Sequence, residues 1–213
     1  MTLAAPRLLA PDLPDALERV SRLGAGADVL ATRVEGLAGR VEAAHATIGE
    51  SAIAAATVDR MDLTGATLTD VVVADLRATE LVARTGRWRT VRMTGGRVGT
   101  LDLSSAELEV VELRGLRIDY LSLAQAKARD VLVADCQITT IDLPGATLTR
   151  VRFDDCRADE VDTRGLRAAH LDLRGLDALG FTDPGALRSA TMTALQVEQH
   201  AAAFAAALGI HVG

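Results

Sequence analysis

The sequence repeats with a period of five residues. From Ile53 to Leu173 a mostly apolar residue stands at every fifth position, without insertion or deletion over 25 such positions. A second apolar or small residue precedes each of them by two, as Met61 precedes Leu63. On an α-helix this spacing would scatter the apolar residues around the circumference, and on one continuous strand a shift of five would move them to the opposite face. The chain can bury both series only if it turns a corner once in every five residues.

Residue types repeat again at intervals of twenty. The second series contains an unbroken column of valines: Val71, Val91, Val111, Val131 and Val151. A column ten residues away contains only Leu, Ile and Val: Leu81, Leu101, Leu121, Ile141 and Val161. Such uniform columns predict that residue n stacks on residue n+20, so that four sides of five residues make one coil. Because stacked coils lie one strand spacing apart, we expect roughly six coils in a rod about 30 Å long.

The composition agrees with a narrow interior. Apolar types make up 49% of the 213 residues, yet aromatic residues make up only 2%. A charged fraction of 24% argues against a disordered chain, and no apolar run approaches the ~18 residues of a membrane-spanning helix. The net charge is −6, and residues 51–175 carry 17 basic and 19 acidic groups. This balance argues against direct nucleic-acid binding, which needs clustered Lys and Arg.

Several short segments of the repeat resemble the pentapeptide-repeat family, whose pattern is Ala-Asp/Asn-Leu-x-x. The matching segments are 61–65 (MDLTG), 101–105 (LDLSS), 141–145 (IDLPG) and 171–175 (LDLRG). The first position departs from the pattern where it is Val or Leu, and the second where it is Arg. The resemblance implies an all-β solenoid, a right-handed quadrilateral β-helix, which we place at residues 41–180.

A solenoid exposes an edge at each end and needs caps. We expect residues 1–40 to form an N-terminal cap that is partly helical or irregular, with a short helix over 14–23 that starts near Asp12. Residues 181–213 should form a C-terminal capping helix and tail. Thr193 and Gln196 have the spacing of a capping box, and Gly209 is the expected terminator. Val197, Phe204 and Leu208 lie on one stripe of this helix, which covers either the last coil or a second chain.

Catalytic and metal-binding signatures are missing from the sequence. Four histidines are scattered without metal-ligand spacing, and we find no nucleophile elbow, Gly-rich phosphate loop or Cys-x-x-Cys motif. Cys136 and Cys156 are twenty residues apart and should be stacked neighbours. A disulfide or a thiolate metal pair is conceivable there, but we favour buried free thiols. We therefore expect no enzyme, no cofactor and no metal. Two cysteines and the lack of a signal peptide favour a cytoplasmic protein.

The surface columns hold the candidate binding residues. One column contains four aspartates, interrupted by Val82 and Ser122: Asp62, Asp102, Asp142 and Asp162. A neighbouring column contains four arginines, interrupted by Gln137: Arg77, Arg97, Arg117 and Arg157. The acidic column could imitate the phosphates of DNA. The alternative, which we favour, is that both columns only solvate the rod through weak cross-coil pairs.

A further group of arginines surrounds Trp88. Arg84, Arg87, Arg89 and Arg92 would form a contact patch for an anionic partner if Trp88 were exposed. We favour the alternative in which Trp88 belongs to the core and the arginines are solvated.

The resemblance carries one functional expectation. Understood members of the pentapeptide-repeat family include proteins that bind DNA gyrase or related topoisomerases, imitate B-form DNA and dimerise through C-terminal helices. For this chain that hypothesis implies a non-catalytic protein whose Asp column contacts gyrase and whose C-terminal helix forms a homodimer. The rival hypothesis is a protein-interaction rod whose partner is unrelated to topoisomerases. Both hypotheses exclude a membrane and direct nucleic-acid binding.

Overall fold

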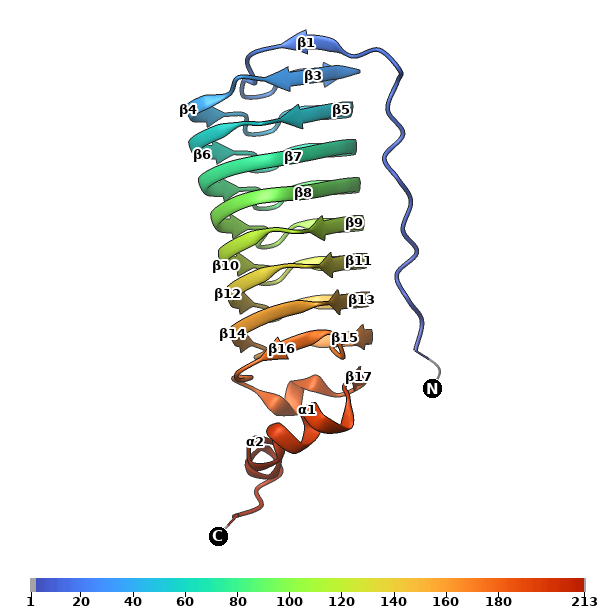
Figure 1. The fold of residues 1–213 in the computed structure, drawn as a ribbon, viewed down its shortest axis with the longest axis vertical. Helices are drawn as coiled ribbons and strands as arrows, with labels where there is room; N and C mark the ends of the chain where they lie inside the picture. Colours follow the sequence, from blue (N-terminus) through green and yellow to red (C-terminus); the bar gives the residue numbers. More distant parts are fainter. Residues whose placement is uncertain (1–2, 213) are drawn as a thin grey trace.

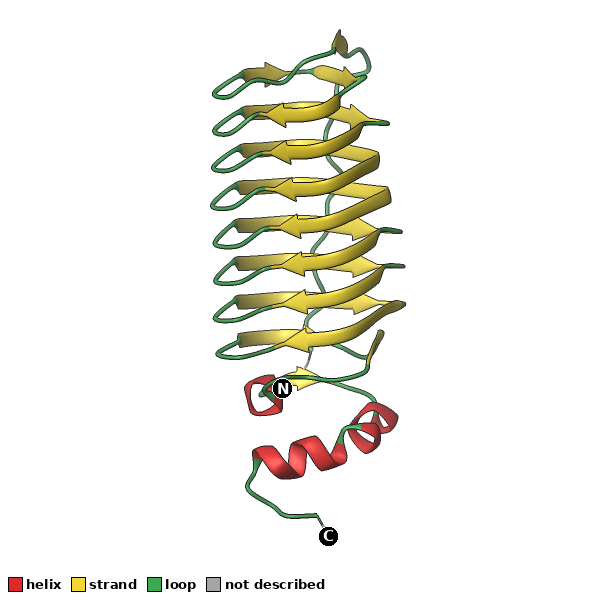
Figure 2. Cartoon of the chain, turned by 90° about the vertical axis from the view of Figure 1, so that its left-hand side faces the viewer, coloured by secondary structure: helices red, strands yellow, loops and turns green. Residues whose placement is uncertain are grey.

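The computed structural model describes residues 3–212, which form a parallel β-helix with two short helices at its C-terminal end (Figures 1 and 2). The strands are β1 (Glu18–Val20), β2 (Asp28–Leu30), β3 (Thr32–Glu35), β4 (Ala38–Glu42), β5 (Thr47–Ala54), β6 (Thr57–Asp62), β7 (Thr67–Val82), β8 (Arg87–Asp102), β9 (Glu107–Arg114), β10 (Arg117–Ser122), β11 (Lys127–Ala134), β12 (Gln137–Asp142), β13 (Thr147–Asp154), β14 (Cys156–Asp162), β15 (Arg167–Asp172), β16 (Leu176–Ala178) and β17 (Ala190–Thr191). The helices are the 3₁₀ helix η1 (Pro184–Leu187), α1 (Ala194–Gln199) and α2 (Ala201–Ala207). None of the helices described is long and apolar enough to cross a membrane.

The predicted twenty-residue stacking is confirmed. Val71 pairs with Val91 and Val91 with Val111, and the column continues through Val131 to Val151. Because all of these pairings are parallel and in register, the backbone N–H and C=O groups of the strands bond to the coils above and below. The four-sided coil of five-residue sides predicted from the repeat is the observed one.

The register of the stacked coils is irregular near the N-terminal end. Gly39 pairs with Val58, nineteen residues ahead, whereas Arg40 pairs with Arg60, twenty residues ahead. Parallel pairing nevertheless reaches back to Glu18 in β1. The rod therefore begins before the expected boundary at residue 41 and contains more coils than the regular repeat alone predicted.

Three of the four corners place one residue per coil at positive φ. In one coil these residues are Gly65 (φ 67°), Asp70 (φ 54°) and Asp75 (φ 52°). Asp tolerates this left-handed region because its short side chain forms local hydrogen bonds. At the first corner the Ala66 N–H donates to the Leu63 carbonyl at 2.9 Å, which closes a β-turn. The corners thus account for the polar residues that separate the apolar pairs in the sequence.

The interior contains one indole, and a glycine lies beside it. Trp88 is only 2% exposed, and a Cβ on Gly86 would lie 3.6 Å from its Nε1 and 3.0 Å from the Ala83 carbonyl oxygen. Within residues 3–212, the Trp88 indole N–H is the one buried side-chain polar atom without a hydrogen-bond partner. Trp88 therefore belongs to the core, as favoured above.

The predicted N-terminal helix is wrong. Residues 3–17, which we call the N-terminal strap, are extended and run along the outside of the rod from β1 towards its C-terminal coils (Figure 1). The Ala4 N–H donates to His170 Nδ1 at 3.2 Å, and the Arg7 N–H donates to an Asp130 carboxylate oxygen at 2.9 Å. Because three prolines interrupt this segment and corner side chains accept its N–H groups, the strap is held extended by the rod.

The C-terminal cap differs from the single helix that we expected. The Thr193–Gln196 capping box is present, and Gly209 ends the last helix at φ 76° with its N–H bonded to the Ala206 carbonyl at 2.9 Å. Between these ends, however, the helix is broken at His200, which ends α1 and precedes α2. The expected stripe is consequently divided between two helices of six and seven residues.

Candidate functional site

The four predicted aspartates lie in one straight row. Asp62, Asp102, Asp142 and Asp162 are the last residues of β6, β8, β12 and β14. Each is in register with its neighbours in the row, which Val82 and Ser122 interrupt as the sequence implies. The structure therefore brings these residues together on one edge of the rod.

Most of these carboxylates are engaged within the protein. Asp102 accepts the Ser104 N–H at 3.0 Å and the Arg84 Nε–H at 2.5 Å. Equivalent bonds from the backbone N–H two residues ahead reach Asp62 at 2.8 Å and Asp162 at 3.0 Å. This Asx-turn bond stabilises the corner that follows each strand, so the Asp of the repeat has a local structural role.

Arginines neutralise three members of the Asp row. Asp62 forms an ion pair with Arg60, Asp102 with Arg84, and Asp162 with Arg164. Hydrogen bonds from the Arg164 guanidinium lower the pKa of Asp162.

The fourth member, Asp142, accepts a hydrogen bond from the Tyr120 hydroxyl at 2.7 Å. Burial acts to raise the pKa of Asp102, but its bonds with Ser104 and Arg84 outweigh burial, so the pKa is lowered. Because arginines pair with three of its four members, the row carries little uncompensated charge.

The arginine row lies on another side of the coil. Arg77, Arg97 and Arg117 are stacked in register, and Gln137 and then Arg157 follow. Beside this row the surface is hollowed by two shallow depressions of about 410 and 280 Å³. Arg97 also forms an ion pair with Asp119 at 3.2 Å. The row is a positively charged strip with acidic residues along its edge.

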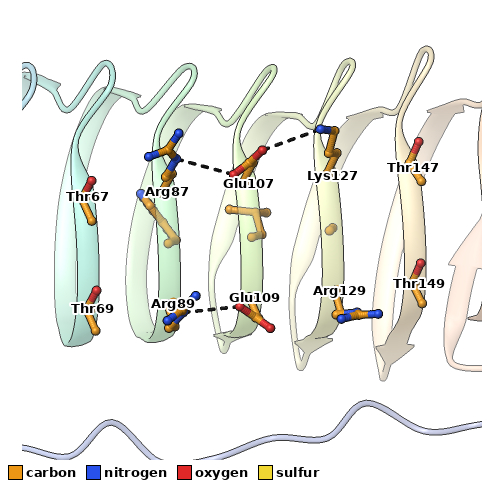
Figure 3. A pocket seen from close by; sticks show the side chains of 13 residues that line it. Thr67, Thr69, Arg87, Arg89, Glu107, Glu109, Lys127, Arg129, Thr147 and Thr149 are labelled. Carbon is orange, nitrogen blue, oxygen red and sulfur yellow. Dashed lines mark ion pairs between the residues drawn. The ribbon is translucent and has the colours of Figure 1, made fainter.

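The side opposite the arginine row carries a larger depression of about 610 Å³. We call it the charged groove and define it by two parallel rows of outward side chains. The first row is Thr67, Arg87, Glu107, Lys127 and Thr147, and the second is Thr69, Arg89, Glu109, Arg129 and Thr149. Figure 3 shows both rows following the stacked strands. The repeat of residue types at twenty-residue spacing was a usable signal for this pair of rows, but sequence reasoning pointed only to Arg87 and Arg89 among them.

The arginines around Trp88 do not form one patch. Arg87 and Arg89 line the charged groove, whereas Arg84 is paired with Asp102 and Arg92 with Glu112 at 2.7 Å. The four arginines are therefore divided between different sides of the coil, in contrast to the contact patch considered as an alternative above.

A fourth depression lies at the C-terminal end. This C-terminal groove has a volume of about 600 Å³ and is lined in part by Met192, Val197, Phe204 and Leu208. Phe204 is half-buried against the core, but Val197 is 46% and Leu208 77% exposed. The apolar stripe expected on the capping helix is thus present, and much of it faces solvent.

The two cysteines are free and buried. The Cys136 thiol lies 3.1 Å from the Ala134 carbonyl oxygen, and the Cys156 thiol lies 3.3 Å from the Val133 carbonyl oxygen. The neighbouring Cys156 thiol and burial raise the pKa of Cys136. Among residues 3–212, no group of three His, Cys, Asp or Glu side chains is placed to hold a metal ion.

The geometry of the coil identifies the fold of the chain. Its sides are five residues long, its coils are stacked at a spacing of twenty residues, and Asp-Leu segments precede the turns at one corner. The chain has the pentapeptide-repeat fold. No family model matches the sequence, and no curated protein matches it.

Solved structures with a similar architecture include two that this pentapeptide-repeat chain matches along most of its length. QnrB1, described as a plasmid-mediated fluoroquinolone resistance protein, is 14% identical over 93% of this chain and 99% of its own, with a TM-score of 0.34. HetL, a pentapeptide repeat protein involved in heterocyst differentiation regulation in the cyanobacterium Nostoc, is 16% identical over 84% of this chain and 86% of its own, with a TM-score of 0.38.

Sequence reasoning missed the contact surface for the N-terminal strap. Asp70, Asp130 and His170 occupy the same corner, and each accepts a strap N–H. Their spacing by multiples of twenty was a usable signal for one polar edge. Nothing in the repeat, however, indicated that the N-terminus would bind there.

Proposed function

We propose that this chain is a non-catalytic rod that binds a protein partner through one side of its β-helix. The observation that supports the proposal is that its charged side chains outside the core form straight rows in register on flat sides of the coil. Such rows offer a rigid pattern of charge, and complementary charge confers specificity and rapid association between proteins.

The acidic row does not favour recognition by DNA mimicry. A surface that imitates DNA needs unbroken negative charge, whereas Arg60, Arg84 and Arg164 pair with three of the four aspartates. We therefore propose a partner whose surface is complementary to a mixed pattern of acidic and basic side chains. Binding to gyrase is the alternative, and it has its own test. Inhibition of gyrase supercoiling, or protection of gyrase from a quinolone, by micromolar purified protein would support the alternative.

The test of the proposed function begins with the full chain immobilised and exposed to lysate of its source. A specific partner should be enriched over blank resin and released by free chain. The enriched protein is then purified and titrated against the chain by calorimetry, where we expect a micromolar or tighter dissociation constant. If no enriched protein binds directly, and gyrase is also unaffected, the proposed function is wrong.

We also propose that a second copy of the chain covers the C-terminal groove. The exposed apolar side chains of Val197 and Leu208 lie beside half-buried Phe204 at the open end of the solenoid. Covering this surface with the same surface of another copy would remove apolar area from water and close the exposed end of the rod.

A further inference from the structure

The charged groove repeats one order of charge in both of its rows. Along each row a threonine is followed by a basic residue, an acidic residue, a basic residue and a second threonine (Figure 3). The central pair is Glu107 and Glu109, which lie side by side on β9. We call the two groove residues of one coil, such as Arg87 and Arg89, a rung. The groove therefore presents a basic, an acidic and a basic rung in sequence, with an uncharged rung at each end.

The charges of the groove remain available to a partner. Arg87 pairs with Glu107 at 3.5 Å and Lys127 with Glu107 at 3.7 Å, while Arg87 and Lys127 are each 75% exposed. Ion pairs at this exposure contribute little to stability, so exchanging them for pairs with a partner costs little. Arg129 forms no ion pair within residues 3–212. Four basic residues against two acidic ones leave the groove positive on a chain whose net charge is −6.

The spacing of the rungs selects the backbone of the partner. Adjacent rungs are one strand spacing apart, about 4.8 Å, so the two basic rungs are about 9.6 Å apart. An α-helix rises 1.5 Å per residue, which places residues i and i+7 about 10.5 Å apart and residue i+3 or i+4 between them. A strand lying along the rod would present side chains every ~6.7 Å on one face, a spacing that does not match the distance of ~4.8 Å between rungs.

We propose that the charged groove binds an α-helix of a partner protein, with acidic side chains at i and i+7 and a basic side chain at i+3 or i+4 on the contacting face. The acidic side chains then meet the Arg87/Arg89 and Lys127/Arg129 rungs, and the basic one meets Glu107/Glu109. This inference rests on the proposed function, because it names the partner element that a protein-binding rod would recognise.

The test uses the full chain and synthetic labelled peptides. The probe is an alanine-rich helical peptide with Glu at i and i+7 and Lys at i+4, and binding is measured by fluorescence anisotropy in low salt. A peptide of the same length with Lys, Glu and Lys at these positions should bind at least about tenfold more weakly, because every contact becomes repulsive. A proline-interrupted version of the probe should also bind at least about tenfold more weakly, because it cannot form the helix.

Two variants assign the binding to the groove. Arg87→Ala with Arg89→Ala should weaken probe binding about tenfold. Truncation to Ala is used because, unlike a change to Glu, it adds no acidic side chain beside Glu107 and Glu109. Arg77→Ala with Arg97→Ala on the opposite side is the matched control and should leave probe binding unchanged. Circular dichroism checks that both variants keep the β-helix.

Four outcomes would overturn the proposal: no binding of the probe, equal binding of the reversed or proline-interrupted peptide, equal loss in the control variant, or no loss in the groove variant. A wrong assignment of the binding site to the charged groove remains distinguishable from a wrong proposed function. If the groove alone is wrong, a partner purified by capture still binds the full chain in calorimetry, with the same affinity for the Arg87→Ala/Arg89→Ala variant. If the proposed function is wrong, no such partner binds at all.

Discussion

The Asp130 carboxylate accepts the Arg7 backbone N–H at 2.9 Å and the Arg150 guanidinium at 2.6 Å through both of its oxygens. One buried side chain thus joins two stacked coils to the strap, which is 123 residues away in sequence. The pKa of Asp130 is lowered, chiefly by the hydrogen bonds from Arg150 and further by the one from the Arg7 N–H.

Replacing Asp130 should release the strap. We expect Asp130→Ala to lower the free energy of unfolding by about 1.5–3 kcal/mol, the usual contribution of hydrogen bonds to a charged group. Cleavage by protease within residues 3–17 should also become faster, which limited proteolysis with mass spectrometry measures. Asp142→Ala is the control, since Asp142 bonds to Tyr120 and has no hydrogen bond to the strap in residues 3–212. Equal cleavage rates in the two variants would contradict the role of Asp130.

The protein should lose stability in acid. Asp102, Asp130, Asp162 and Asp172 all have pKa values lowered in the folded protein. A lowered folded pKa stabilises the protein above the unfolded pKa of about 3.9, and this contribution disappears as the pH falls through the folded values. Urea unfolding between pH 7 and pH 2 should therefore show a decline that begins near pH 4 to 5. A free energy of unfolding that stays constant down to pH 2 would refute this linkage.

Gly96 should tolerate no side chain. Its φ is 95°, and a Cβ would lie 2.2 Å from the Leu76 carbonyl oxygen. We expect Gly96→Ala to cost at least about 3 kcal/mol, from left-handed strain together with the backbone clash. Gly115→Ala separates the two causes, because Gly115 has φ 65° but a Cβ there would lie 3.9 Å from its nearest neighbour, the Gly95 backbone nitrogen.

For Gly115→Ala we expect a cost of about 1–2 kcal/mol from strain alone. Thermal denaturation of both variants measures the difference. Similar losses of stability would show that close approach of the backbone at Gly96 is unimportant.

The homodimer proposal predicts the mass of the protein in solution. Light scattering should give twice the mass of the 22.4 kDa chain, and Val197→Asp with Leu208→Asp should give a monomer because buried charges would face each other. Leu30→Asp, at an exposed leucine near the other end of the rod, should remain a dimer. A monomeric wild-type protein would rule out the dimer.

The five-residue period was sufficient to predict the coil. Since every inward position must fit between the same positions of the coils above and below, the Val71 and Leu81 columns specify the twenty-residue stacking without any knowledge of tertiary structure. The scarcity of aromatic residues, and the small residue at Gly86 beside Trp88, follow from the same narrow interior.

Contacts between non-repeating segments and the rod could not be predicted in this way. The sequence predicted a short helix starting near Asp12, but the extended strap forms because corner side chains over a hundred residues away accept its N–H groups. The break at His200 likewise divides a stripe that is continuous in the sequence. The sequence by itself determined the repeating coil, because each rung makes the same local contacts. The tertiary structure alone decided where the ends bind and which charges remain unpaired, because those depend on single contacts that no period repeats.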